Sequence, residues 1–176
     1  QIKNPLFPHV VVIQNDYSDS QLKGLYLQSN LLVAPSRGEG FGLPIGEVMR
    51  LGIPVITTGW GGQLDFVNAE NSWLIDYNFS PSLSHFQLDQ SYWAEPSTIH
   101  LSKLLVELFN SSETQIRVKT EAAKKATNSY TWDSVASSNI EFVKERIGIF
   151  DNTHLNFGCI STWNSKCGIA SYSKNL

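Results

Sequence analysis

Two glutamates in the first third of the chain flank a short glycine-rich segment that could hold a polar ligand. Glu39 and Glu47 stand at the two ends of the string EGFGLPIGE. Glycine lets a backbone approach a ligand closely and adopt positive φ. Carboxylates accept hydrogen bonds from paired hydroxyls of the kind that sugars and ribose carry. Two glutamates at this spacing are usually just solvated side chains beside a turn, so the glycines between them are the discriminating feature.

The same segment predicts an anion site. Pro44 suits the first turn of a helix over residues 44–51, which Gly52 would end. The first N–H groups of a helix have no partner within the helix, and the positive end of its dipole favours a phosphate. This helix would follow a buried strand at residues 31–35, and ligands of open α/β sheets bind at the carboxyl ends of strands. We therefore expect sugar hydroxyls, a phosphate and ribose hydroxyls to bind in sequence here.

Glycine is concentrated around this segment. Nine of the 12 glycines lie between Gly24 and Gly62, and Gly61-Gly62 follows the next expected strand. The chain has 176 residues, 41% of them hydrophobic, and a formal net charge of −3. This composition excludes a disordered chain and argues against an electrostatic nucleic-acid binder. No apolar run approaches the roughly 20 residues of a membrane span.

Apolar strands and helices alternate over the first half, which predicts an α/β fold with a parallel sheet. The expected strands are 9–14, 31–35, 54–58 and 72–76, and the expected helices are 19–28, 44–51 and 63–67. Residues 78–93 are expected to be irregular. A helical C-terminal part follows, at 99–109, 112–126 and 132–147, the last capped by Thr131.

The chain resembles the nucleotide-sugar-binding, C-terminal half of GT-B glycosyltransferases, closest to the retaining family 4, or glycosyltransferase group 1. The string that carries the likeness is PSRGEGFGLPIGEVMRLGIPVITTGWGG, supported by SYWAEPSTIHLSKLL and by Tyr130-Thr131-Trp132. The resemblance implies a partial Rossmann-like parallel sheet with flanking helices over residues 1–147, lacking its first βα units. It also implies a linker at 148–156. Residues 157–176 resemble the start of a following GT-B N-terminal domain, as in a tandem enzyme.

The resemblance assigns roles residue by residue. Glu39 would contact hydroxyls of the donor sugar and is the expected catalytic residue, although it is not needed as a general base. Glu47 would hold the ribose hydroxyls. The other expected donor-binding residues are Gly38, Gly40, Phe41, Gly42 and Leu43. Further candidates at the border of the site are Arg37, Trp60, Gly61 and Gly62. Trp93 and Trp132 are expected in the core.

The expected reaction transfers a hexosyl group from a nucleoside-diphosphate sugar, with retention, to a glycan or lipid-linked acceptor. The resemblance implies a cytoplasmic enzyme of polysaccharide biosynthesis that requires no cofactor and no metal. The four histidines also show no ligand spacing, and Cys159 and Cys167 are read as reduced thiols. The family's diphosphate-neutralising Arg and Lys, the N-terminal GT-B domain and its catalytic His have no counterpart here. We therefore expect the chain alone to be inactive.

Two alternatives remain open. One is a non-catalytic nucleotide-sugar-binding module, and the other is a different GT-B enzyme, an epimerase or a phosphorylase. Lys119, Lys124 and Lys125 share one expected helix, where a solvated basic face is the ordinary interpretation and peripheral membrane contact is the alternative.

Overall fold

The computed structural model describes residues 8–82 and 90–147. The chain divides into two units, Gln1–Tyr130 and Thr131–Leu176. In the second unit, Thr131 Oγ1 accepts a hydrogen bond from the backbone N–H of Ser134 at 3.2 Å and caps helix α5 (Trp132–Ile147), as expected. Trp132 was expected in the core, but its side chain is exposed. The expected linker and following domain, 148–176, lie outside the described residues.

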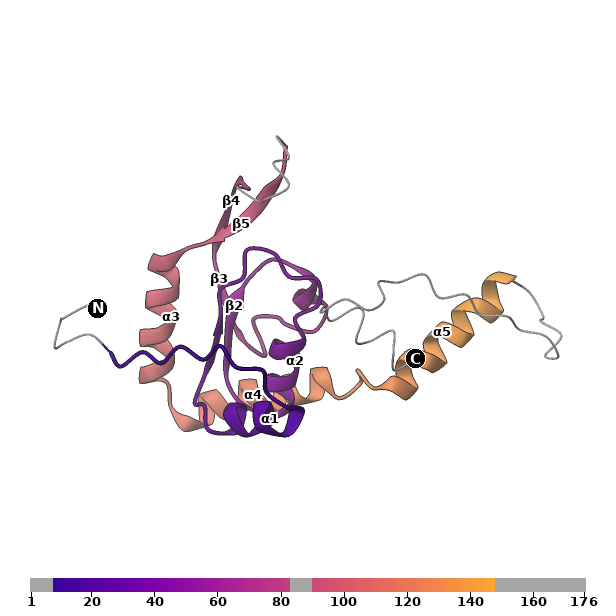
Figure 1. The fold of residues 1–176 in the computed structure, drawn as a ribbon, viewed down its shortest axis with the longest axis horizontal. Helices are drawn as coiled ribbons and strands as arrows, with labels where there is room; N and C mark the ends of the chain where they lie inside the picture. Colours follow the sequence, from indigo (N-terminus) through magenta and orange to yellow (C-terminus); the bar gives the residue numbers. More distant parts are fainter. Residues whose placement is uncertain (1–7, 83–89, 148–176) are drawn as a thin grey trace. The chain divides into compact units, whose positions relative to one another are not determined.

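A three-stranded parallel sheet forms the centre of the first unit. Its strands are β1 (Leu32–Ala34), β2 (Val55–Thr58) and β3 (Trp73–Ile75), in the order β1-β2-β3. Val33 pairs with Ile56, and Thr57 pairs with Leu74. All four residues of β2 are buried. The predicted α/β class, a parallel sheet with flanking helices, is therefore confirmed (Figure 1).

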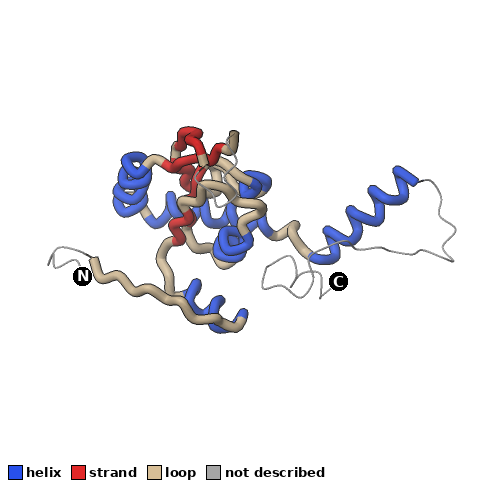
Figure 2. The backbone as a smooth tube through the Cα atoms, turned by 45° about the horizontal axis from the view of Figure 1, so that its top comes forward, coloured by secondary structure: helices blue, strands red, loops and turns tan. Residues whose placement is uncertain are grey.

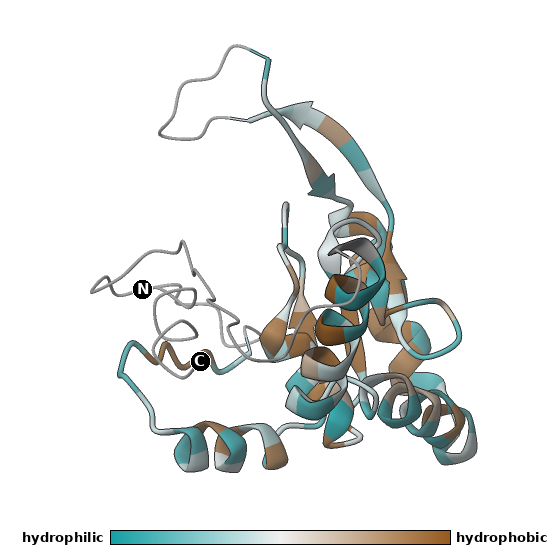
Figure 3. Cartoon of the chain, turned by 90° about the vertical axis from the view of Figure 1, so that its right-hand side faces the viewer, coloured by the Kyte–Doolittle hydropathy of each residue, from teal (hydrophilic) through white to brown (hydrophobic). Residues whose placement is uncertain are grey.

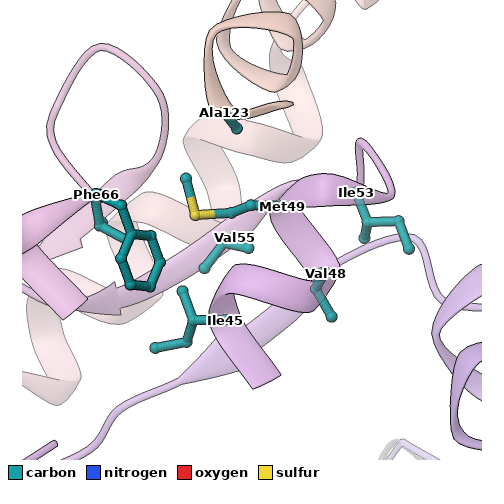
Figure 4. Packing of buried hydrophobic residues seen from close by; sticks show 8 residues of the cluster. Ile45, Val48, Met49, Ile53, Val55, Phe66 and Ala123 are labelled. Carbon is teal, nitrogen blue, oxygen red and sulfur yellow. The ribbon is translucent and has the colours of Figure 1, made fainter. Parts of the chain in front are cut away.

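Successive residues of β2 pack on opposite faces of the sheet, as the two-residue period of a strand requires. Val55 joins a cluster with α2 (Leu43–Arg50) and α4 (Glu113–Thr127), which includes Met49, Phe66 and Ala123 (Figure 4). Ile56 joins the other cluster, with Trp73, Ile75 and two leucines of α3 (Thr98–Asn110). The helices α2 and α3 thus cover opposite faces (Figure 1).

Two helices of this unit begin with capping boxes that were expected from the sequence. In α1 (Asp19–Leu27), Ser18 accepts from the backbone N–H of Gln21 while the Gln21 side chain accepts from the backbone N–H of Ser18. Ser112 and Gln115 form the same reciprocal pair at the start of α4. Each box supplies partners for two otherwise unpaired N–H groups, and so fixes where the helix begins.

The prediction of a strand at residues 9–14 is wrong. This segment is irregular and exposed, and within the described residues the parallel sheet begins at β1 (Figure 2). The run of Val10, Val11, Val12 and Ile13 has high strand propensity. Propensity alone does not make a strand, because the backbone groups of a strand need a neighbouring strand to pair with.

The prediction that residues 78–93 are irregular is also wrong, at both ends of that range. Strands β4 (Tyr77–Pro81) and β5 (Tyr92–Pro96) form an antiparallel pair, in which Phe79 lies opposite Ala94. This hairpin extends beyond the end of the parallel sheet (Figures 1 and 3). Its residues alternate between the two faces, so that Tyr77 and Phe79 share one face while Trp93 and Glu95 share the other.

Lys119 on α4 does not belong to a solvated basic face. Its ammonium group donates to the carbonyl oxygens of Ala69 and of Ser72, the latter at 2.9 Å, and lies 4.8 Å from the ring centroid of Trp73. Burial lowers the pKa of Lys119. These contacts attach α4 to the start of β3.

Candidate functional site

The candidate site lies where the loops after β1 and β2 meet. Residues 35–42 follow β1, and residues 59–61 follow β2 and lead into the short 3₁₀ helix η1 (Gly62–Asp65). The backbone N–H of Gly62 donates to the carbonyl oxygen of Glu39 at 2.8 Å. The structure therefore joins Glu39 to the Gly61-Gly62 pair at the carboxyl ends of neighbouring parallel strands, where α/β folds bind ligands.

Gly42 is the turning point between the first loop and helix α2. It adopts φ 86° and ψ 49°, a left-handed conformation that glycine tolerates best. A Cβ atom at Gly42 would lie 3.1 Å from the Cβ of Gln63, 3.2 Å from Ile45 Cδ1 and 3.3 Å from Glu39 Cγ. Both the backbone angle and the surrounding side chains therefore favour glycine here, and Glu39 packs against this turn.

The N-terminus of α2 is open to an anion. The helix begins at Leu43 with Pro44 in its first turn, and no side chain caps it. Leu43 is exposed at this end. Backbone N–H groups at an uncapped helix start, with the positive end of the helix dipole behind them, can bind a phosphate group. The proline occupies a position whose N–H would otherwise lack a partner.

The two glutamates have different surroundings. Glu39 is half-buried in the loop, whereas Glu47 is exposed on α2. Tyr26 of α1 faces Glu47. Burial raises the pKa of the Tyr26 phenol, and the negative charge of Glu47 and a hydrogen bond to it raise it further. Both carboxylates are accessible acceptors for hydroxyl groups of a ligand.

Gln63 is a residue of this site that the sequence reasoning missed. Its side chain is fully buried, and its Nε2 donates to the carbonyl oxygens of Thr58 at 3.0 Å and Trp60 at 2.9 Å. It therefore fixes the turn after β2 while its Cβ faces Gly42. A polar residue directly after two glycines, in a segment otherwise expected to pack in the core, was the available signal.

Arg37 is not placed to neutralise a phosphate. Its guanidinium donates to both carboxylate oxygens of Glu95, with Nε at 2.5 Å from Oε2 and Nη2 at 2.9 Å from Oε1. Its carbon Cζ lies 4.7 Å from the ring centroid of Trp93. The Glu95 hydrogen bond raises the pKa of Arg37, and the same bond lowers the pKa of Glu95. Trp93, expected in the core, is half-buried beneath Arg37.

Trp60 lies at the border of the site with two rings of β4. Its ring centroid is 4.9 Å from that of Phe79, edge to face, and 5.8 Å from that of Tyr77. The Trp60 side chain remains 44% exposed. Aromatic rings at these separations attract each other, so the three form one cluster directly before Gly61.

A hollow of about 140 Å³ lies beside α2. The rings of Phe41, Phe66 and Tyr130 line it, with centroids 5.1 to 5.7 Å apart, together with Leu43 and Glu47. Pockets for whole cofactors or drug-sized ligands measure roughly 300–1,000 Å³. This hollow is therefore too small for a complete nucleotide-sugar.

Within the described ranges 8–82 and 90–147, no group of three or more His, Cys, Asp or Glu side chains is placed to hold a metal ion. No helix there is both long enough and apolar enough to cross a membrane.

Residues 3–88 match the family model for glycosyl transferases group 1. The match spans 86 of the 176 residues, just under half of the chain. The matched range contains every candidate residue of the site, from Arg37 to Gly62, and the β1–β2–β3 sheet that positions them. The recognition of the family from its glutamate-glycine string is thereby confirmed.

Two curated proteins resemble the chain over part of their length. It is 40% identical over 80 residues to an alpha-1,3/1,6-mannosyltransferase ALG2 of Kluyveromyces lactis, covering 44% of this chain and 14% of that protein. It is 26% identical over 122 residues to a sucrose synthase of Melioribacter roseus, covering 69% of this chain and 14% of that protein. The chain thus spans about one seventh of the length of these two curated relatives.

A solved glycosyltransferase structure from Rickettsia africae shares the fold. The TM-score is 0.56 at 21% sequence identity, and the match covers 77% of this chain and 31% of that one. The likeness is one of architecture.

Proposed function

We propose that this chain is the donor-binding part of a retaining glycosyltransferase, which moves a hexosyl group from a nucleoside-diphosphate sugar to a glycan or lipid-linked acceptor. The observation that carries the proposal is the uncapped start of α2 at Gly42, placed between Glu39 and Glu47. An anion site between two accessible carboxylates matches a ligand with a diphosphate between two sets of hydroxyls. The group 1 domain supports the same reaction class.

In the proposed complex, each element has one task. The N–H groups at the start of α2 bind the diphosphate and stabilise the negative charge that develops on it as the glycosidic bond breaks. Glu39 accepts hydrogen bonds from hydroxyls of the transferred sugar and keeps it oriented while its oxocarbenium-like transition state forms. Glu47 accepts hydrogen bonds from the ribose. No metal or other cofactor has a task in this scheme.

Arg37, the cation nearest to the candidate site in the sequence, does not serve the diphosphate in this proposal. The guanidinium of Arg37 is engaged by Glu95. The chain also spans only 14% of the two curated relatives, and in this proposal the acceptor-binding part lies outside these 176 residues. We therefore propose that the chain alone binds a donor without transferring its sugar. Turnover of a radiolabelled nucleotide-sugar by residues 1–176 would contradict this.

Calorimetric titration with UDP-glucose, GDP-mannose and ADP-glucose, each beside its nucleoside diphosphate, tests the assignment of roles. Glu39→Gln should weaken binding of the nucleotide-sugar about tenfold and leave nucleoside diphosphate binding unchanged, because Glu39 contacts the sugar alone. Glu47→Gln should weaken both ligands, because both contain ribose. Glu70→Gln, an exposed glutamate of the turn before β3, is the matched control. Equal losses in the two test variants would refute the assignment.

A further inference from the structure

Arg37 connects the loop that carries Glu39 to the β4–β5 hairpin. Its guanidinium and the carboxylate of Glu95 form two parallel hydrogen bonds, at 2.5 and 2.9 Å. Charge-assisted pairs with two parallel bonds have a defined geometry, unlike single contacts between flexible side chains. The pair therefore fixes the direction of the Arg37 side chain relative to β5.

Two more contacts hold Arg37 on the same strand. The guanidinium lies over the ring of Trp93, whose Nε1 donates to Ser80 Oγ on β4 at 2.9 Å. The backbone N–H of Ala94 donates to the carbonyl oxygen of Arg37 at 3.1 Å. Three consecutive residues of β5 thus bind one residue of the loop, through its main chain and its side chain together.

The rest of the loop has few such restraints. A Cβ atom at Gly38 or Gly40 would meet no other group within 4 Å, although the carbonyl group of Gly40 lies close to Gly62. Glu39, between them, is held by the bond from the Gly62 N–H to its carbonyl oxygen. Arg37 is the restraint on the side of β1, two residues before Glu39.

We propose that Arg37 is a positioning residue which, through Glu95 and Trp93 of the hairpin, holds the loop so that Glu39 meets the donor sugar. This inference rests on the proposed function for the nature of the ligand. It makes the β4–β5 hairpin part of the donor site through its contacts with Arg37. Arg37 acts on Glu39 and not on the diphosphate.

If the Arg37–Glu95 pair served only to stabilise the fold, its removal would mainly lower the melting temperature. The side chains of Arg37 and Glu95 are 52% and 41% exposed, and exposed ion pairs contribute little to global stability. Removal of the pair should therefore leave the melting temperature almost unchanged. The conformation of residues 38–41 and the affinity for the sugar should respond instead.

Four variants and a control test the inference: Arg37→Gln, Glu95→Gln, Arg37→Lys, the exchanged pair Arg37→Glu with Glu95→Arg, and Glu121→Gln. The control removes the exposed ion pair of Glu121 with Lys124, on α4. One measurement is amide hydrogen exchange of residues 38–43 in the free chain. The other is calorimetric affinity for whichever of UDP-glucose, GDP-mannose and ADP-glucose the unaltered chain binds, beside its nucleoside diphosphate.

We expect both glutamine variants to accelerate exchange at residues 38–41 and to weaken nucleotide-sugar binding about tenfold, with nucleoside diphosphate binding changed less than twofold. Arg37→Lys should behave like Arg37→Gln, because lysine lacks the paired donors. The exchanged pair should recover part of the affinity, and Glu121→Gln should change nothing.

Three outcomes would overturn the inference. They are unchanged exchange at residues 38–41, a loss of nucleoside diphosphate binding in Arg37→Gln alone, or a fall in melting temperature that accounts for the whole loss of affinity. The second outcome would make Arg37 a phosphate ligand. If the unaltered chain binds no nucleotide-sugar, the proposed function fails, while the exchange measurement still decides whether the hairpin holds the loop.

Discussion

The backbone N–H of Gly62 donates to the carbonyl oxygen of Glu39 and thereby joins the loops that follow two neighbouring strands. This approach is so close that a Cβ atom at Gly62 would overlap the carbonyl group of Gly40. The backbone itself, and not a side chain that could move aside, occupies the space. Glycine at position 62 is therefore a condition for the two loops to meet.

We expect Gly62→Ala to lower the free energy of unfolding by about 1–3 kcal/mol, because the added methyl group forces the two backbones apart. Urea unfolding followed by tryptophan fluorescence measures the change. Gly38→Ala, in the loop after β1 but with open space around its Cβ position, is the matched control and should change stability by less than about 1 kcal/mol. Equal effects of the two substitutions would show that the close approach is not a constraint.

Gln63→Met should lower the free energy of unfolding by about 1–3 kcal/mol. The substitution keeps the side-chain length but leaves the carbonyl oxygens of Thr58 and Trp60 without the donor that Gln63 supplies. Gln28→Met, at an exposed helix end, is the control in the same denaturation experiment. Unchanged stability in Gln63→Met would mean that these two hydrogen bonds do not fix the turn after β2.

Because the Tyr26 phenol titrates at alkaline pH, we expect the folded chain to lose stability there. Its pKa is raised above the ordinary value of 10, by burial first and then by Glu47. As the pH rises through 10, the unfolded chain releases this proton while the folded chain keeps it. The contribution of Tyr26 is thus fully present below pH 10 and is lost above it.

Melting temperatures measured between pH 8 and pH 11 check whether Tyr26 contributes to the alkaline loss of stability. Tyr26→Phe should show a shallower alkaline decline than the unaltered chain, because the titrating phenol is gone. Tyr92→Phe, at an exposed position of β5, should retain the full decline. If both variants follow the same curve, Tyr26 is not the group responsible.

Met49→Ala should be among the most destabilising single changes on α2. Met49 is fully buried between the sheet and α4, so its truncation leaves a cavity that the neighbouring side chains cannot fill (Figure 4). The expected decrease in the free energy of unfolding is about 2–5 kcal/mol. Leu27→Ala, at an exposed position of α1, should lose less than about 1 kcal/mol. A loss in Met49→Ala as small as that of Leu27→Ala would exclude tight packing around Met49.

Local signals in the sequence predicted the helices and the parallel sheet well. Ser18 with Gln21, and Ser112 with Gln115, marked helix starts that the structure reproduces, because a capping box depends only on residues three apart. The apolar run around Ile56 identified β2, since a strand buried on both faces needs hydrophobic residues at successive positions.

Contacts between residues far apart in the sequence could not be predicted from such local signals. Arg37 and Glu95 are 58 positions apart, and neither residue type nor local spacing indicates that they meet. The sequence therefore predicted Arg37 only as a candidate at the border of the site, without its partner in the hairpin. The strand prediction at 9–14 failed for a related reason. Strand propensity depends on local sequence, whereas strand pairing depends on residues elsewhere in the chain. The roles of Glu39 and Glu47 stay predictions.

The exposed run Val10–Ile13 has a practical consequence for handling the protein. In the described part of the chain, β1 pairs on one edge only, and the four consecutive β-branched side chains at residues 10–13 are exposed. An open sheet edge and an exposed β-branched run can each be a template for pairing between molecules. Colloidal self-association should therefore grow with concentration, and a lysine in place of Val11 is the change that we expect to keep the isolated chain in solution.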